Sequence, residues 1–203
     1  MAILLEHRGK RPAIAPSAYV APNAVICGDV VVGADSRVLF GAVITAEGGQ
    51  VVTGERCIVM EHALIRGRAG HSTRLGDDVL VGPHAHVNGA VIGDAVFLAT
   101  SASVFPGARI GARARVRINA VVHVNSVLPR GALVPIGWIA LGDPAEIFSP
   151  ERHEEYEPLL RQLDFPGTVF GITPEEWQED GMSRVAPRYV ELFGEHVDDG
   201  LLE

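Results

Sequence analysis

The chain has 203 residues, of which 47% are hydrophobic and only 6% aromatic, and it carries 23 glycines. This length and composition indicate one aliphatic domain, or one domain with an appendage. The 17 basic and 25 acidic residues give a net charge of −8, and without a basic block nucleic-acid binding is not expected. With no signal-like segment and no long apolar run, we expect a soluble cytoplasmic protein without membrane contacts, whose two cysteines stay reduced.

The first part of the chain has a six-residue period with two interruptions. Residues 1–18 contain two prolines and are predicted to form a short edge strand and a cap. From Val20 onward, aliphatic residues recur at every sixth position until the period breaks at residues 45–52 and again at the polar segment 66–74. We expect both breaks to be loops, and loops held on a stiff scaffold are common positions for binding sites.

The longest uninterrupted run extends from Ile92 to Trp138. Neither a helix, with a period of 3.6, nor a strand, with a period of 2, repeats every six residues. Hexapeptide repeats form parallel β-helices, in which three rungs close one triangular coil, and we count about nineteen rungs and hence about six coils. Two columns carry this pattern: the aliphatic Ile92, Leu98, Val104, Ile110, Val116, Val122, Leu128 and Val134, and the smaller Val96, Ala102, Ala108, Ala114, Ala120, Ser126 and Ala132.

The remainder of the chain is predicted to be helical. We therefore divide the chain into an all-β coil, residues 1–148, and a helical extension, residues 149–203, that packs on the coil or on a neighbouring subunit. The segment that begins with Thr173-Pro174 and two glutamates has the pattern of a helix N-terminus. The expected elements are a helix over residues 150–164, a break at 165–167, and a second helix from Thr173 to about Gly194 with a bend near Pro187.

Four segments of the coil match a known family: VAPNAVICGDVVVGADSRVLFGAVI from Val20, VTGERCIV, LGDDVLVG and GDPAEIF. On these segments the rungs from Val20 to Ala145, about two thirds of the chain, resemble the γ-carbonic anhydrases. The resemblance implies a left-handed β-helix and a homotrimer with the site between subunits. In that family, three histidines from two neighbouring chains hold zinc, iron or cobalt, and the metal activates water to attack carbon dioxide.

The sequence departs from the family at the positions that the resemblance assigns to the metal. Residues 58–61 stand where the family has Asn-Ile-Gln-Asp, and Arg66 takes the place of the first histidine. Pro83 and Asn88 take the places of the other two, and residues 45–47 replace the family's Arg-Gly-Asp. A guanidinium has a fixed positive charge and cannot replace a neutral imidazole on a metal. We therefore expect the family's carbonic anhydrase reaction to be lost.

Four histidines surround the second break of the period: His62, His71, His84 and His86. Because one coil is three rungs, the rung at Val59 should lie directly beneath the rung at Val81. His62 and His84 are each the third residue after these valines. The two imidazoles should therefore stack at one corner, about 4.8 Å apart, which is the usual strand spacing.

Several kinds of site are compatible with this segment. The four histidines could bind Zn²⁺, or two of them could act with Glu61 in a two-histidine-one-carboxylate site. By the same count Arg66 lies beneath Asn88, and Arg66 with Arg68 could instead hold a phosphate or carboxylate. The alternative is that the histidines are structural residues on the surface or in a trimer interface. His123 also points outward, although a lone outward histidine is usually structural.

Three functions follow from these observations. The first is a γ-carbonic anhydrase-like trimer with a rebuilt subunit-interface site, acting as a metal-dependent hydrolase, hydratase or lyase on a small molecule. Zinc is then the expected metal, and His84, Glu61, Arg66 and Asn88 are the expected catalytic residues. The second is a catalytically silent trimeric scaffold. The third is a hexapeptide acyltransferase that uses CoA, with His71 or His84 as the general base.

Overall fold

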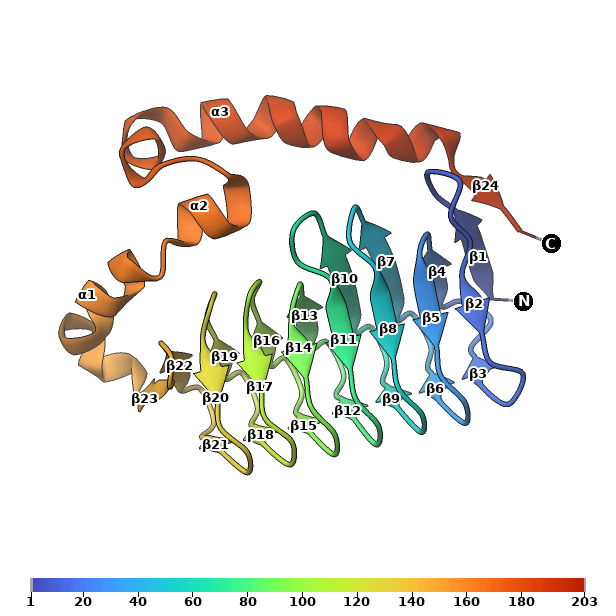
Figure 1. The fold of residues 1–203 in the computed structure, drawn as a ribbon, viewed down its shortest axis with the longest axis horizontal. Coiled ribbons are helices and arrows are strands. Elements are labelled where there is room, and N and C mark those ends of the chain that lie inside the picture. Colours follow the sequence, from blue (N-terminus) through green and yellow to red (C-terminus); the bar gives the residue numbers. More distant parts are fainter. Residues whose placement is uncertain (1, 203) are drawn as a thin grey trace.

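A computed structural model of the chain describes residues 2–202, and in it the hexad repeats form a parallel β-helix (Figure 1). The coil has three sides, which are one sheet of ten strands and two sheets of seven. Within each side, the strands of successive coils pair in parallel register. The predicted fold class, a parallel β-helix of hexapeptide repeats followed by helices, is confirmed.

We name the sides sheet 1, sheet 2 and sheet 3. Sheet 1 contains β1 (Ile3–Glu6), β4 (Val25–Cys27), β7 (Val43–Glu47), β10 (Leu64–Arg68), β13 (His86–Asn88), β16 (Ser103–Val104), β19 (Val121–Val122), β22 (Ile139–Leu141), β23 (Glu146–Phe148) and β24 (Gly200–Leu201). Sheet 2 contains β2 (Ala13–Ile14), β5 (Val30–Val32), β8 (Val51–Thr53), β11 (Thr73–Leu75), β14 (Val91–Ile92), β17 (Arg109–Ile110) and β20 (Val127–Leu128). Sheet 3 contains β3 (Tyr19–Val20), β6 (Arg37–Val38), β9 (Ile58–Val59), β12 (Leu80–Val81), β15 (Phe97–Leu98), β18 (Arg115–Val116) and β21 (Leu133–Val134).

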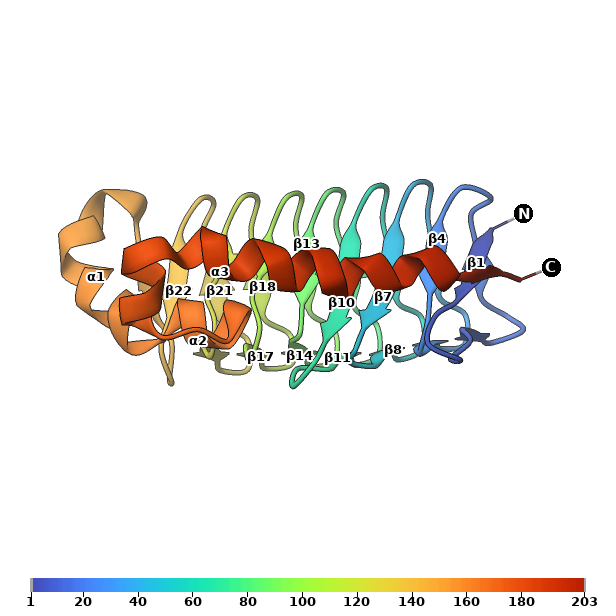
Figure 2. The same ribbon diagram turned by 90° about the horizontal axis from the view of Figure 1, so that it is seen from above.

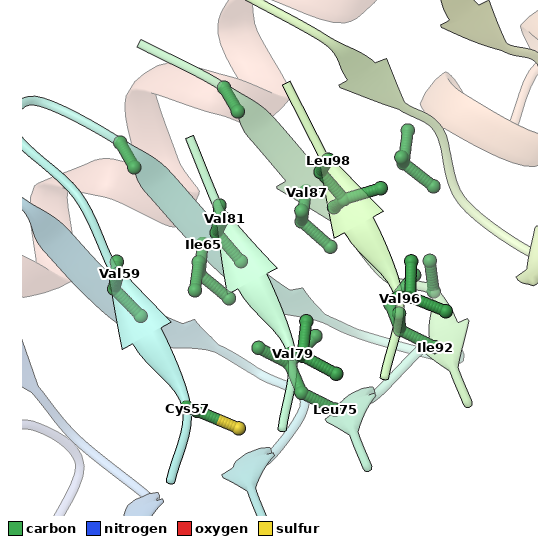
Figure 3. Packing of buried hydrophobic residues seen from close by; sticks show 14 of the residues in the cluster. Cys57, Val59, Ile65, Leu75, Val79, Val81, Val87, Ile92, Val96 and Leu98 are labelled. Carbon is green, nitrogen blue, oxygen red and sulfur yellow. The ribbon is translucent and has the colours of Figure 1, made fainter. Parts of the chain in front are cut away.

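The core consists of the two columns that the period predicts. All eight aliphatic residues of the long run are at most 3% exposed. The smaller residues, with Cys57 among them at 1% exposure, fill the corners between strands. Figure 3 shows how these side chains stack coil upon coil in the interior. An aliphatic layered core of this kind is stabilised by burial of apolar surface, at about 25 cal/mol per Å².

The coil is longer than the period predicts. Eight strands of sheet 1, from β1 to β22, follow one another coil by coil, so there are about eight coils and not six. The first coil begins with residues 2–18, which contribute β1 and β2 where only an edge strand and a cap are expected. The period reveals only part of this coil, because Ile14 stands six residues before Val20 whereas Leu4, the core-facing residue of β1, stands ten residues before Ile14.

The two breaks in the period are partly β-structure and not simply loops. The strands β7 and β10 are each five residues long, and they pair along their whole length from Val43↔Leu64 to Glu47↔Arg68. Bridges from Arg68 to Gly48 and His71 extend this pairing beyond the coil. The interruptions therefore lengthen two adjacent strands of sheet 1, and they place Glu47 and Arg68 at its raised edge.

Within the described residues, three α-helices and two short 3-10 helices follow the coil: η1 (Pro150–Arg152), α1 (His153–Gln162), α2 (Phe165–Phe170), α3 (Pro174–Gly194) and η2 (Glu195–Asp198). The predicted start of α3 is confirmed, since Thr173 and Glu176 form a reciprocal capping box. The expected break at 165–167 instead begins α2, because the Asp164 carboxylate accepts a hydrogen bond from the backbone N–H of Gly167 and caps the new helix. The irregularity in α3 lies at Asp180 and not near Pro187.

The last helix turns back along the coil. Figures 1 and 2 show α3 running lengthwise over the outer face of sheet 1, from the last coils towards the first. After η2, the strand β24 pairs antiparallel with β1, so the end of the described chain joins the first coil. Within residues 2–202, no helix has the length and apolar character needed to cross a membrane.

We predict that Ile110→Ala lowers the free energy of unfolding by about 2–5 kcal/mol, because it empties space in the stacked column. The matched control is Arg109→Ala on the same strand, whose outward side chain is 63% exposed and bridges Asp143. An exposed ion pair contributes at most about 1 kcal/mol. Urea unfolding monitored by circular dichroism measures both values, and equal losses for the two variants would contradict the inward–outward assignment.

Candidate functional site

The coil places one row of outward side chains under α3. The strand register pairs Cys27 with Thr45, Thr45 with Arg66, and Arg66 with Asn88. The next two members of the row follow directly after the paired Val104 and Val122 of sheet 1. Neighbours in the row are about 4.8 Å apart along the coil axis, because the strand spacing sets the interval. We call this set the outer row: Cys27, Thr45, Arg66, Asn88, Phe105 and His123.

The C-terminal helices close over the outer row and leave a cavity of about 340 Å³. The coil contributes its polar lining, which comprises Arg8, Glu47, Arg66, Arg68, His86 and Asn88. The helices contribute an aromatic wall, which includes Phe165 and Phe170 of α2 and Tyr189 and Phe193 of α3. The cavity therefore has a charged floor and an apolar roof.

The polar floor of the cavity is not satisfied by the protein itself. In the part of the chain that the structure describes, five buried side-chain atoms have no hydrogen-bond partner. Four of them belong to cavity-lining residues: Arg66 Nε, Arg68 Nε, His86 Nε2 and Asn88 Oδ1. An unsatisfied buried polar group costs about 1–3 kcal/mol, so such groups are normally rare and scattered. Their convergence on one cavity leaves its floor with donors and acceptors that the protein does not use.

The charges around the cavity have different partners. The Arg66 guanidinium lies over the Phe193 ring, 5.6 Å from its centroid, which is a cation–π contact. Arg68 donates a hydrogen bond to the carbonyl oxygen of Val169, at the end of α2. Glu47, in contrast, accepts hydrogen bonds from the Thr45 hydroxyl at 2.8 Å and from a ring nitrogen of His196 at 3.0 Å. The arginines are therefore the groups whose charge faces the cavity.

His86 is held as a neutral base at the cavity floor. Burial lowers the pKa of its imidazole, and the positive charge of Arg66 lowers the same pKa further. A neutral imidazole with an unpartnered nitrogen can accept a proton from a bound molecule. Its neighbours in the fold are the edge of Phe105 on one side and Leu64, its strand partner, on the other.

The structure stacks His62 and His84 as the rung count predicts. Their rings are 13° from parallel, with centroids 5.2 Å apart, at the exposed corner that leads from sheet 3 into sheet 1. Both residues have a positive φ, 57° and 56°, and Ser101 and Asn119 occupy the same left-handed corner position in later coils. The His62 ring lies so close to Gly41 that a Cβ there would be 2.5 Å from it. The pair thus also has a plain structural role in the turns.

The other predicted ligands are placed elsewhere. His86 lies in the cavity, whereas His71 lies in the turn after β10, where its backbone bonds to that of Arg68. Glu61 is beside His62 at the half-exposed corner. Within residues 2–202, the four histidines do not form a set of three or more ligand atoms within metal-binding reach of one another.

The metal of the γ-carbonic anhydrases does not fit the residues at its family positions here. Arg66 and Asn88 are register partners, as the rung count predicts. A guanidinium has five donors, a fixed positive charge and no lone pair for a cation. Pro83, at the third position, has no side-chain ligand atom. No step of the family's metal chemistry can therefore be derived from this place in the coil.

The structure also reveals a cluster that the sequence patterns do not indicate: His7, Cys27, His196 and Asp199. His7 Nδ1 is 2.6 Å from Asp199 Oδ1, and His196 Nδ1 is 2.7 Å from Asp199 Oδ2. The two imidazole rings stack with centroids 4.5 Å apart. As much as 192 residues separate these partners, so no local spacing identifies them. The one available signal is the strand alternation at Cys27, which follows the buried Ile26 and so points outward.

Comparison with known proteins supports the resemblance of the coil. No family model matches the chain. It is 30% identical over 100 residues to γ-carbonic anhydrase 3, mitochondrial, of Arabidopsis thaliana, which covers 46% of this chain and 39% of that protein. It is 26% identical over 109 residues to a carbonic anhydrase of Geobacillus kaustophilus, and the match covers 54% of this chain and 60% of the relative. It is 28% identical over 90 residues to the uncharacterized transferase YtoA of Bacillus subtilis, and that match covers 44% of this chain and 53% of the relative.

Among solved structures, a hexapeptide transferase family protein from Anaplasma phagocytophilum aligns with 79% of this chain and 92% of its own, at 24% identity and a TM-score of 0.47. The six-residue period and the parallel ladders of the coil define the class as a hexapeptide-repeat β-helix protein. Within that class the chain is similar to the γ-carbonic anhydrases, as the sequence motifs predict. It spans only about half the length of the curated relatives that it matches.

We predict that His123 makes the protein less stable in mild acid. Burial between Phe105 and Phe165 lowers the pKa of this imidazole below its ordinary value of 6.5. The unfolded chain therefore binds a proton that the folded state does not, and the free energy of unfolding falls as the pH drops through that value. In His123→Phe, unfolding experiments between about pH 7.5 and 5.5 should show a smaller loss than in the wild type.

The matched control is His153→Phe, which replaces an exposed histidine of α1. This variant also replaces one histidine by phenylalanine, but at an exposed position, so it separates the effect of the buried site from the loss of a histidine as such. A His123→Phe profile that runs parallel to the wild type would show that the buried imidazole takes up no proton on unfolding.

Proposed function

We propose that this protein is a homotrimeric γ-carbonic anhydrase-like enzyme whose family metal positions have become a binding site for a small organic carboxylate. The observation that supports this function most directly is the convergence of four unpartnered polar atoms on the cavity over the outer row. Similarity to carbonic anhydrases supports the family origin of the coil. At the former cation positions, an arginine selects a ligand of the opposite charge.

The chemistry of the floor favours a carboxylate. The Arg66 Nε and the Arg68 Nε are free to donate, and a guanidinium can bind a carboxylate through two parallel hydrogen bonds. The volume of about 340 Å³ lies at the small end of ligand sites and suits a metabolite-sized molecule. The aromatic roof, with Phe170 and Phe193, suits an apolar body better than a bare inorganic anion.

His86 is the proposed base of this site. Its neutral imidazole faces the same cavity as Arg66 and Arg68, so it can take a proton from the carbon or water next to a bound carboxylate. The two guanidinium groups then stabilise the negative charge that develops on the substrate. This arrangement is suited to a hydratase, hydrolase or lyase reaction in which no metal at Arg66 takes part.

A second candidate is transfer of an acyl group from CoA. The similarity to the transferase YtoA supports it, together with the exposed position of His84 at the coil corner. In that function His84 would act as the general base, and the aromatic cavity would have no direct role. The two candidates therefore use different histidines.

We predict that Arg66→Gln weakens carboxylate binding by about 10- to 100-fold, because a hydrogen bond to a charged group contributes about 1.5–3 kcal/mol. Acetate and succinate serve as probes in calorimetric titrations at constant ionic strength, with phosphate and bicarbonate for comparison. Arg74→Gln is the matched control, since Arg74 points outward from sheet 2, away from the cavity and from sheet 3.

Unchanged carboxylate affinity in Arg66→Gln would refute the proposed site. The wild type is also expected to show no carbon dioxide hydration, with or without added zinc. A rise in the unfolding midpoint with acetyl-CoA in the wild type and in Arg66→Gln, together with acyl transfer that is lost in His84→Ala, would favour the second candidate instead.

The proposed trimer interface is the apolar side of the coil around sheet 3. Sheet 1 is covered by helices, whereas sheet 3 and its corners expose large apolar side chains. Such a patch on a coil is typical of an interface between copies of one chain. The exposed residues are Tyr19, Phe40, Ile58, Phe97, Ile118, Leu133 and Ile136.

We predict that Phe97→Asp converts the trimer to monomers, because it would bury a charge in the apolar interface. Phe97 is 38% exposed on sheet 3, and the control Val91→Asp changes a residue that is 46% exposed on sheet 2. Light scattering after size exclusion should give three times the chain mass of 21.6 kDa for the wild type and the control. A monomeric wild type, or dissociation in the control alone, would refute the proposed interface.

A further inference from the structure

The cluster at the junction of the first coils and the C-terminal segment has the composition of a metal site. His7 and Cys27 belong to the coil, whereas His196 and Asp199 follow α3. One ligand atom from each side chain lies within 4.8 Å of all the others. In tetrahedral zinc sites, bonds of about 2.0–2.3 Å place the ligand atoms somewhat closer than this. Small side-chain rotations are therefore sufficient to close the cluster around an ion.

The cluster is mostly buried, and a second carboxylate lies beside it. His7 is 3% exposed and Cys27 is 4% exposed, and the Asp199 side chain is only 9% exposed. Glu47, at 6% exposure, lies against His196 from the other side. Two carboxylates are thus buried within reach of one another's partners in a low-dielectric place, which is costly unless cationic groups compensate them.

We propose that His7, Cys27, His196 and Asp199 bind one divalent cation, with Zn²⁺ as the expected ion. Two imidazole nitrogens, one thiolate sulfur and one carboxylate oxygen are the ligand types that zinc accepts in a four-coordinate site. Loading transfers the thiol proton of Cys27 to solvent, because the thiolate is the ligand. With four protein ligands and no open position, the ion is structural and does not activate water.

The role of the ion is to fasten the helical cover of the cavity. Two of its ligands come from the coil and two from the segment that follows α3, so metal binding would join the coil to this segment. The strand β24 follows Asp199 directly and pairs with β1. Glu47 lines the cavity and also bonds to His196, so it connects the ion site to the charged floor. The closed cavity therefore depends on a site about two coils away from Arg66.

This site is separate from the place where the resemblance puts the family's metal. Those positions are Arg66, Pro83 and Asn88, none of which belongs to the cluster. It also differs from the corner of His62 and His84, whose stacked rings have no third ligand within reach among the described residues. The three places can be distinguished by substitution.

The test uses the full chain without a histidine tag. After treatment with EDTA, the protein is titrated with Co²⁺ and, in competition with a coloured chelator, with Zn²⁺. We expect one ion per chain, visible bands of tetrahedral cobalt, and a near-ultraviolet band from charge transfer between the Cys27 thiolate and cobalt. Cys27→Ser should abolish that near-ultraviolet band and weaken zinc binding at least 10-fold.

The matched controls separate this cluster from the other sites. Cys57→Ser changes the second buried cysteine, and the double variant His62→Ala/His84→Ala removes the corner pair; both should bind like the wild type. His196→Asn should weaken binding without removing the sulfur band. Arg66→Gln should also bind metal normally. The proposed carboxylate site and the proposed metal site can therefore be refuted independently of each other.

A second measurement tests the fastening role. Zinc should slow amide exchange in the C-terminal peptide that contains β24, where the Leu202 N–H donates to the Leu4 carbonyl oxygen. In Cys27→Ser the exchange should no longer respond to zinc. The proposal is overturned if the wild type binds no stoichiometric ion, if Cys27→Ser keeps the sulfur band, or if only the His62/His84 double variant loses the metal.

Discussion

The hydrogen-bonded register between successive coils is the constraint on which the rest of this structure depends. Each backbone ladder fixes the neighbours of a side chain one coil away, at the strand spacing of about 4.8 Å. A side chain that points outward in one coil is therefore held beside its counterpart in the next. Cys27, Thr45, Arg66 and Asn88 lie in one row for this reason, although 18 to 22 residues separate them in the sequence.

The outer row becomes part of an enclosed cavity because α2 and α3 cover it. The aromatic residues of α2 and α3 exclude water from the row and bring Phe193 over Arg66. In this desolvated place a guanidinium interacts more strongly with an anion than it would at the surface. The same burial keeps His86 neutral, because charging it would require a second cation beside Arg66. The positive charge of Arg66 and the neutral imidazole of His86 can thus occur together in one cavity of about 340 Å³.

The features that could be predicted from sequence are those that the hexad itself determines. The buried columns, the stacked pair at His62 and His84, and the pairing of Arg66 with Asn88 all follow from counting rungs. Counting rungs does not reveal strand pairing that lies outside the hexad. The strand β1 and the extra length of β7 and β10 are of this kind. The contacts of the C-terminal segment could not be predicted at all, because they depend on how α3 folds back over sheet 1.

The outer row also explains how one scaffold can hold two sites of opposite charge preference. Arg66 faces the cavity with a fixed positive charge, whereas Cys27, two places along the row, lies beside Asp199 and within the field of Glu47. Burial and these carboxylates together raise the pKa of the Cys27 thiol to about 12, so the thiol stays protonated until a cation displaces its proton. Glu47 stands between the two sites, because it lines the cavity and bonds to His196. The two sites therefore share one neighbouring carboxylate, and the rigid coil fixes the distance between Cys27 and Arg66.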